Sequence, residues 1–137
     1  MTQINVYLHF DGKCREAMTF YRECLGGELT MMTAGESPMA ANIPAAMKDK
    51  IMHARLQSGG LVLMGSDMMG PWERVAGNTI SVIIMGGGPE ELRSFFSKLS
   101  KGGKVTHELE EVFFGTYGDL TDKFGVDWMF QADAKRA

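Results

Sequence analysis

The chain has 137 residues, 45% of them hydrophobic, so it fits one domain that can bury a substantial core. Its formal net charge of −3 argues against nucleic acid as a partner, because nucleic-acid binding needs clustered Lys and Arg. No apolar run approaches the roughly 20 residues that cross a bilayer, and the N-terminus lacks a basic segment followed by an apolar one. We therefore expect a cytoplasmic protein with no nucleic-acid or membrane partner.

The chain contains an internal repeat. Residues 4–27 read as a strand, a tight turn, a helix and a double-glycine stop, and residues 80–103 repeat this order. Two modules of under about 70 residues each would be marginally stable alone. We therefore expect one domain over residues 1–137, in which the two modules share a core.

The first module is expected to span residues 4–64. Alternating side chains predict a strand over residues 4–10, with one aliphatic and one mixed face. Apolar residues at three- and four-residue spacing then predict a helix from Cys14 to Leu25.

The rest of the first module is expected to form three strands. They cover residues 28–33, 51–57 and 61–64, and Ser58, Gly59 and Gly60 make an antiparallel hairpin of the last two. Residues 34–50 carry prolines and no clear stripe, which predicts a surface excursion with a helical turn near Ala45.

A linker rich in helix and strand breakers is expected over residues 65–78, followed by the second module over residues 79–131. Pro89 suits the first position of its helix. The expected strands cover residues 79–85, 104–110, 117–121 and 126–131. Each module therefore reads β, α, β, β, β.

The two cysteines are expected to be reduced. Cys14 and Cys24 lie on the same predicted helix, about 15 Å apart along its axis, which is too far for a disulfide. Cys14 begins this helix, where the helix dipole favours a thiolate, but no histidine base is placed beside it. A packing role for Cys14 is the expectation, with a catalytic role as the alternative.

Motifs of one protein family recur along nearly the whole chain. They are Tyr7, Leu8, Phe10, Asp11 and Gly12; Glu16, Ala17, Phe20, Tyr21, Leu25, Gly26 and Gly27; His53 and Ala54; Ser66 and Asp67; and 121–129. On these residues the chain resembles the vicinal oxygen chelate superfamily, which includes glyoxalase I, bleomycin and fosfomycin resistance proteins and extradiol dioxygenases. Within that superfamily it looks most like the PhnB-like group.

The resemblance implies an α+β fold. Two βαβββ modules would form a curled mixed β-sheet around a cavity, with the helices on the outside. It also implies a homodimer, because paired modules from two chains often complete the cavities of the proteins it resembles. The reaction does not follow from the fold, since superfamily members run unrelated chemistries on it.

Metal-using members of the superfamily place His or Glu ligands on four strands. Carried onto this chain, those positions fall near Asn5 or Val6, His53 or Arg55, Thr79, and Met129. His53 is the one plausible ligand among them, and Met129 stands where a glutamate would complete the site. We therefore expect no bound metal. If a divalent metal does bind, we expect it at His53 and His9, with Asp127 or Glu110 as carboxylates.

A small-molecule site is expected where the strands carry polar and aromatic side chains. His53 and Arg55 share one strand face, and Tyr7 and His9 share the mixed face of the first strand. Arginine suits an anionic or oxygen-rich ligand. Satisfied or exposed strand histidines remain the alternative to a binding role.

Two further residues are candidates for this site. Asp127 falls on the same strand face as Met129, and a solvated turn residue is the alternative. Trp72 lies in the linker and could cap a pocket or make a subunit contact.

The remaining aromatic residues and the third histidine are expected in the core, at the surface or in a loop. Trp128 is expected in the core and His107 at the surface. Phe113, Phe114 and Tyr117 surround glycines, so they could form an aromatic rim over a cavity or anchor an ordinary loop.

The leading functional hypothesis is a PhnB-like protein that binds a small molecule in a β-sheet cavity. The second is a metal-dependent lyase, isomerase or dioxygenase, in which the metal would polarise substrate oxygens. The third is a docking or dimerisation module without a ligand.

Overall fold

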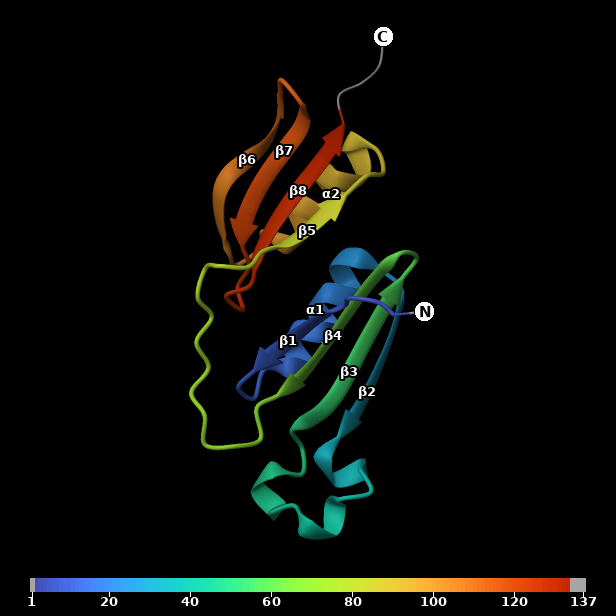
Figure 1. Ribbon diagram of the computed structural model, residues 1–137, viewed down its shortest axis with the longest axis vertical. Helices are drawn as coiled ribbons and strands as arrows, with labels where there is room; N and C mark the ends of the chain where they lie inside the picture. The colour runs from blue at the N-terminus through green and yellow to red at the C-terminus, as the bar shows by residue number, and fades with distance from the viewer. Residues whose placement is uncertain (1, 134–137) are drawn as a thin grey trace. The chain divides into compact units, whose positions relative to one another are not determined.

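The computed structural model describes residues 2–133, which form eight β-strands, two α-helices and three short 3-10 helices (Figure 1). The chain divides into two compact units between Val75 and Ala76. The first holds β1 (Val6–Phe10), α1 (Cys14–Leu25), β2 (Glu28–Thr33), β3 (Ile51–Ser58) and β4 (Leu61–Asp67). The second holds β5 (Val82–Met85), α2 (Pro89–Leu99), β6 (Lys104–Val112), β7 (Gly115–Thr121) and β8 (Asp127–Asp133).

Each unit contains a four-stranded mixed sheet. The strand order is β1-β4-β3-β2 in the first sheet and β5-β8-β7-β6 in the second. In both, the first strand runs parallel to the last strand of its module and the other pairs are antiparallel. The predicted α+β fold of two βαβββ modules is therefore confirmed, as is the antiparallel β3–β4 hairpin.

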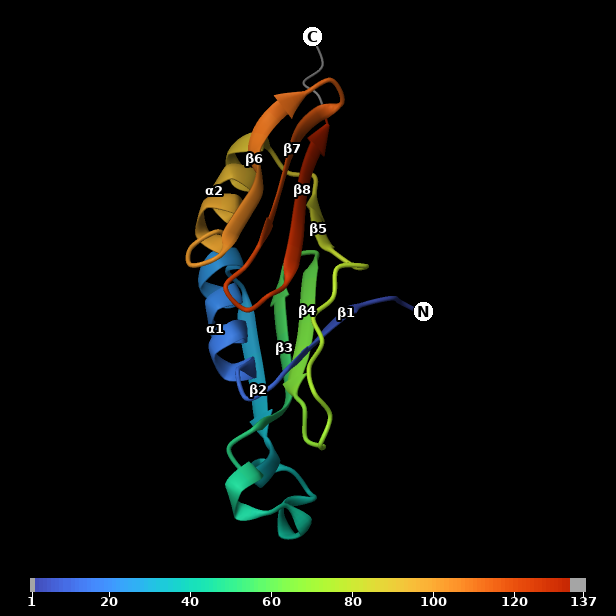
Figure 2. The same ribbon diagram turned by 90° about the vertical axis from the view of Figure 1, so that its left-hand side faces the viewer.

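Helix α1 covers one face of the first sheet, as Figure 2 shows. Its predicted apolar stripe is buried, as is Phe20. The stripe packs on β2, β3 and β4, whose inward side chains include Ala54, Leu56 and Leu63. The helix begins and ends at the predicted residues because the stripe begins at Cys14 and glycines 26 and 27 take positive φ angles after Leu25.

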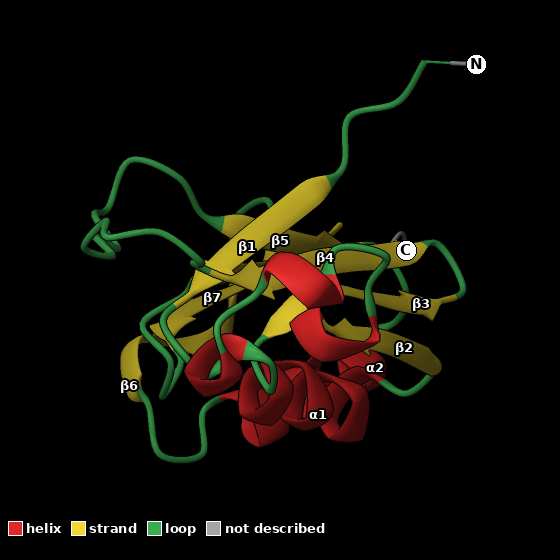
Figure 3. Ribbon diagram, turned by 90° about the horizontal axis from the view of Figure 1, so that it is seen from below, coloured by secondary structure: helices red, strands yellow, loops and turns green. Residues whose placement is uncertain are grey.

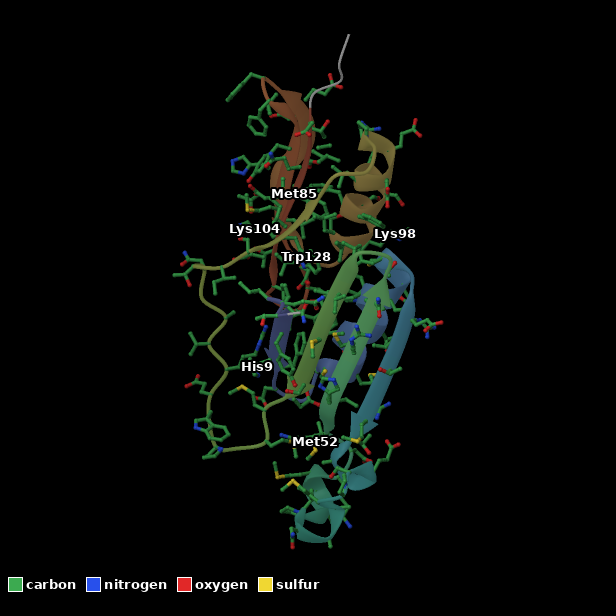
Figure 4. All side chains as sticks on the ribbon, turned by 45° about the vertical axis from the view of Figure 1, so that its right-hand side comes forward. His9, Met52, Met85, Lys98, Lys104 and Trp128 are labelled. Atoms are coloured by element: carbon green, nitrogen blue, oxygen red, sulfur yellow. The ribbon has the colours of Figure 1, made fainter. Side chains whose placement is uncertain are left out.

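Helix α2 packs on β8 in the same way. Pro89 occupies its first turn, and Leu92, Phe96 and Leu99 are buried. The rings of Phe96 and Phe130 meet edge to face at 5.1 Å between centroids. Trp128, labelled in Figure 4, is 1% exposed, which confirms its predicted place in the core.

The other faces of the sheets carry different side chains, because alternate strand residues point to opposite sides. We call these the helix-distal faces. On the first sheet this face holds Tyr7, His9, His53, Arg55, Gln57, Val62, Met64 and Ser66. On the second sheet it holds Ile83, Met85, His107, Tyr117, Asp119, Thr121, Asp127, Met129 and Gln131.

Several predicted boundaries were wrong. Strand β4 continues through Asp67, so the linker does not begin at residue 65. Its extension is explained by Asp67, whose two carboxylate oxygens accept hydrogen bonds at 2.9 Å from the backbone N–H groups of Cys14 and Ile51. This buried carboxylate ties the end of β4 to the starts of α1 and β3.

The loop predicted around the second module's aromatic residues is mostly strand. Strand β6 reaches Val112 and β7 starts at Gly115, so Phe113 and Phe114 form a two-residue turn and Tyr117 lies within β7. Pairing with β8 decides this, because β7 matches it residue for residue from Gly115 onward.

The excursion between β2 and β3 is ordered as three 3-10 helices, Ala34–Glu36, Ala40–Asn42 and Ala45–Met47 (Figure 3). The last confirms the predicted turn near Ala45. No helix among residues 2–133 has the length and apolar character needed to cross a bilayer.

Candidate functional site

Four of the predicted site residues share the helix-distal face of the first sheet. Strand β1 pairs with β4, and β4 pairs with β3, so Tyr7 and Arg55 lie on either side of Met64 in one row. The next row contains His9 beside Ser66. Figure 4 labels His9 on β1.

The aromatic rings on this face are close together. The Tyr7 ring lies 5.2 Å from the His9 ring and 6.2 Å from the His53 ring, measured between centroids. The structure thus places two histidines that are 44 residues apart in the sequence near the same tyrosine ring. We call Tyr7, His9 and His53 the ring cluster.

Arg55 adds positive charge beside the ring cluster. Its Nη1 donates a hydrogen bond of 2.8 Å to Oε1 of Gln57, the next residue on the same face of β3. This bond steadies the guanidinium, which has five N–H donors in all and therefore retains donors for a ligand. The arrangement combines flat aromatic surface, imidazole nitrogens and a guanidinium on one strand face.

A hollow of about 440 Å³ lies at the start of β1. Its lining consists of Gln3, Ile4, Asn5, Val6, Gly60 and Val62. Val62 of this lining lies on the helix-distal face and pairs with Gln57, so the hollow adjoins the face that carries the ring cluster.

Trp72 is not part of the ring cluster. Its side chain is 68% exposed, and its ring lies against the backbone of Gly70 within the linker. Asp127 lies in the second module, on the helix-distal face with Met129, and accepts a hydrogen bond of 2.6 Å from Oγ1 of Thr121.

Sequence reasoning missed a polar cluster on β6 and β7. Nδ1 of His107 lies 2.9 Å from both carboxylate oxygens of Asp119, and the hydroxyl of Tyr117 donates a 2.6 Å hydrogen bond to Oδ2 of Asp119. His107 is exposed, as predicted, but it is not isolated. The Tyr117–Asp119 spacing of two residues was a usable signal, whereas the pairing of His107 with Asp119 depends on a register shift in β6.

Hydrogen bonding sets the protonation states of this cluster. The bond to Asp119 raises the pKa of Tyr117 to about 12, and burial and the negative charge of Asp119 act in the same direction. Burial of the Asp119 carboxyl raises its pKa, but the hydrogen bonds from Tyr117 and His107 outweigh burial and lower the pKa below its usual value. Asp119 is therefore a carboxylate near neutral pH.

The Cys14 thiol is suited to packing rather than catalysis. Burial raises its pKa to about 12, and the nearby Asp67 carboxylate adds to the effect. Cys14 and Cys24 are both buried.

The residues present do not fit a resident divalent metal within either module. Among residues 2–133 no three His, Cys, Asp or Glu side chains converge as a metal ion requires. The ring cluster supplies two imidazoles, His9 and His53, while Met64 and Ser66 lie in the rows beside them.

Comparisons with known proteins define the family. The model of the Glyoxalase/Bleomycin resistance protein/Dioxygenase superfamily matches residues 3–130. Protein YjdN of Escherichia coli K12 is 32% identical over 136 residues, covering 92% of each chain. The crystal structure of PA1353 from Pseudomonas aeruginosa is 38% identical, with a TM-score of 0.87 over 98% of this chain and 100% of that one.

A PhnB protein from Bacillus cereus shares the fold at 23% identity, with a TM-score of 0.75 over 96% of this chain and 99% of that one. The resemblance inferred from sequence motifs is thereby confirmed, and the PhnB-like proteins are among the structural neighbours. The family model and the two relatives above 30% identity agree over nearly all of the chain. The chain belongs to the glyoxalase/bleomycin resistance protein/dioxygenase superfamily.

Proposed function

We propose that the protein binds a small anionic or oxygen-rich molecule on the helix-distal face of the first sheet. The observation that carries the proposal is the convergence of the ring cluster with Arg55 on that one face. The guanidinium would pair with the charged or oxygen-bearing group of the ligand. The rings of Tyr7 and His53 would contact its flat or apolar part.

The surroundings of the ring cluster support a ligand of mixed character. Met64 lies in the row between Tyr7 and Arg55, and Met32 pairs with His53 across β2 and β3. Methionine side chains adapt to irregular apolar shapes, so they suit contact with ligand carbon atoms. Ser66 beside His9 adds a hydroxyl that can donate or accept.

The binding proposal is tested by a thermal-shift screen of small carboxylates, phosphonates and aromatic acids on the native protein. A true ligand at a hundred times its Kd stabilises by about 2.7 kcal/mol, which raises the Tm measurably. Arg55→Gln should weaken binding of such a ligand about tenfold or more, because a charge-assisted contact is lost. Arg93→Gln, an exposed change on α2, is the matched control and should bind as wild type.

Two outcomes would overturn the proposal. One is a screen in which no compound of these classes raises the Tm. The other is a hit whose affinity is the same for wild type, Arg55→Gln and His53→Gln, since the ligand would then bind elsewhere.

We also propose that binding needs no divalent metal, because the donor set within each module does not fit one. Elemental analysis of protein purified without chelator should find less than about a tenth of an equivalent of metal. Stoichiometric Zn, Ni, Mn or Fe would instead favour the metal-dependent lyase, isomerase or dioxygenase.

We also propose that the protein is a homodimer in the cytoplasm. Large apolar side chains are exposed in both modules, among them Ile83 and Met85 on β5, and a second copy would cover them. The two buried, reduced cysteines suit that compartment. Analytical ultracentrifugation should give the mass of two chains, and a monomer at micromolar concentration would contradict the dimer.

A further inference from the structure

The polar cluster on the β6–β7 hairpin is not used by the function proposed above. Figure 1 shows this hairpin at one edge of the second sheet. His107 on β6 faces Asp119 on β7, and Tyr117 lies two residues before Asp119 on β7. Phe113 and Phe114 form the turn that joins the two strands. An imidazole, a carboxylate and a phenol therefore lie together, and the phenol ring of Tyr117 lies beside that of Phe114.

The hydrogen bonds fix which ring nitrogen of His107 carries a proton. Asp119 is ionised and can accept hydrogen bonds but not donate them. Nδ1 lies 2.9 Å from both of its oxygens, so Nδ1 must be the N–H nitrogen. In the neutral imidazole Nε2 is then an acceptor, and the side chain is 67% exposed, so a ligand can reach it.

Asp119 is itself held in place. The Tyr117 hydroxyl donates to Oδ2 at 2.6 Å, which keeps the carboxylate directed at His107. Tyr117 keeps its proton through the neutral pH range, so it acts as a donor to Asp119 and does not compete with His107 for a proton. A carboxylate placed in this way stabilises the imidazolium that forms when Nε2 accepts a proton.

The aromatic rings define the shape of a ligand. The Phe114 ring lies 6.1 Å from the Tyr117 ring at 72°, and 5.0 Å from the Phe113 ring at 88°. Phe113 is 96% exposed on the turn, so its ring is open to solvent. The rings offer edges and faces to another aromatic group.

The charges around the cluster select against anions. Asp119 is ionised, and Glu110 lies opposite Tyr117 in the strand register. A carboxylate or phosphate would be repelled, because it brings a negative charge and no proton that would turn the imidazole into a compensating imidazolium. A neutral aromatic ring that carries a weakly acidic hydroxyl fits both the charges and the rings.

We propose that this hairpin is a binding site for phenols whose hydroxyl is about as acidic as an imidazolium, in which His107 Nε2 accepts the proton of the ligand hydroxyl. The O–H bond of the phenol breaks, its electron pair stays on oxygen, and the proton forms a new N–H bond at Nε2. The products are a bound phenolate and an imidazolium whose Nδ1–H remains on Asp119. Asp119 and Tyr117 are positioning residues, and Phe114 contacts the ligand ring.

The probe for this site is para-nitrophenol, whose phenolate form absorbs visible light. At a pH equal to the pKa of the free probe, half of the free probe is phenolate and an ordinary histidine is largely neutral, so excess wild-type protein should increase the phenolate absorbance. His107→Gln should abolish the increase. Asp119→Asn should lower the phenolate fraction at saturating probe, with the ratio of phenolate to phenol falling about tenfold, because the imidazolium loses its charged partner. Phe114→Ala should weaken affinity and leave that fraction at saturation unchanged.

The controls separate this site from the one proposed on the first sheet. Arg93→Gln, an exposed change on α2, should retain the full phenolate signal. Loss of the signal in His53→Gln but not in His107→Gln would overturn the inference. An unchanged spectrum of the probe with wild-type protein would overturn it as well. Side-chain ¹H–¹⁵N spectra of wild-type protein give an independent measure, because the Nε2 resonance of His107 should shift towards its protonated value when the probe binds.

Discussion

The two modules share one backbone plan but differ on their helix-distal faces. In the first sheet Met64 lies between Tyr7 and Arg55, and in the second Met129 lies between Ile83 and Asp119. The strand order, the parallel first pair and the antiparallel hairpins correspond throughout. The phenol of Tyr7 therefore corresponds to the alkyl side chain of Ile83, and the guanidinium of Arg55 corresponds to the carboxylate of Asp119.

The faces under the helices have not diverged in this way. Leu63 in the first module and Trp128 in the second are both buried against their helices. Their strand partners are also apolar, since Leu63 pairs with Val6 on β1 and Trp128 pairs with Val82 on β5. Burial requires an apolar side chain at these positions, whereas the helix-distal positions are free to change. The duplicated scaffold therefore carries two different chemistries, and the comparison can be tested by matched substitutions.

The largest effect is expected from the buried carboxylate of each module. Asp122 accepts hydrogen bonds from the backbone N–H groups of Phe124 and Val126 and from the indole N–H of Trp128, at 2.8 to 3.1 Å. Asp122→Ala leaves these donors unsatisfied and should lower the free energy of unfolding by about 4 kcal/mol. Asp67→Ala removes two such bonds and should cost about 3 kcal/mol.

Urea denaturation measures both losses. Asp49→Ala, at an exposed position, is the control and should change stability by less than about 0.5 kcal/mol. If Asp122→Ala or Asp67→Ala lowered the free energy of unfolding no more than this control, the buried carboxylates would not be important for the stability of their modules.

The second glycine after each helix should be the next most sensitive position. A Cβ on Gly27 would overlap the carbonyl oxygen of Gln57, and one on Gly103 would overlap that of Thr121. Gly27 also has a φ of +92°, so Gly27→Ala should destabilise by about 3 kcal/mol and Gly103→Ala by about 2 kcal/mol.

Gly60→Ala is the matched control, because a Cβ there meets nothing within 4 Å and φ is unexceptional. Its Tm should equal or slightly exceed that of wild type. Equal losses at glycines 27 and 60 would show that close packing of the helix end against the sheet is not the cause.

A smaller effect is expected from the ionisation of Tyr117. Its pKa is raised to about 12 by the hydrogen bond to Asp119, so this bond adds stability below the unfolded-state tyrosine pKa of about 10. That contribution is lost as the pH rises towards 12. Absorbance titration of tyrosinate should show the high step in wild type and a step near pH 10 in Asp119→Ala. Persistence of the high step in that variant would exclude Asp119 as its cause.

The smallest effect concerns thiols, which occur only in the first module. The raised pKa of Cys14 and the burial of both thiols predict no reaction with a disulfide reagent in the native protein at pH 8. Both thiols should react once urea unfolds the protein. A fast-reacting native Cys14 would contradict the packing role and restore the catalytic alternative.

The fold was largely predictable because its signals are local. The apolar stripe from Cys14 to Leu25 and the glycines after it predict α1 to the residue. Strand alternation also predicted that Tyr7 and His9 share one face of their strand and that His53 and Arg55 share one face of theirs. The boundary errors at Asp67 and Gly115 arose where a distant partner, α1 or β8, extends the strand.

What the sequence by itself determined is therefore the order of elements and the face on which each side chain lies, since both follow from periodicity along the chain. The tertiary structure alone decided which strands are neighbours, and so which side chains meet. His53 approaches Tyr7 only because β4 pairs with both β1 and β3. Asp119 meets His107 only because of an irregular register in β6, for which no local pattern exists.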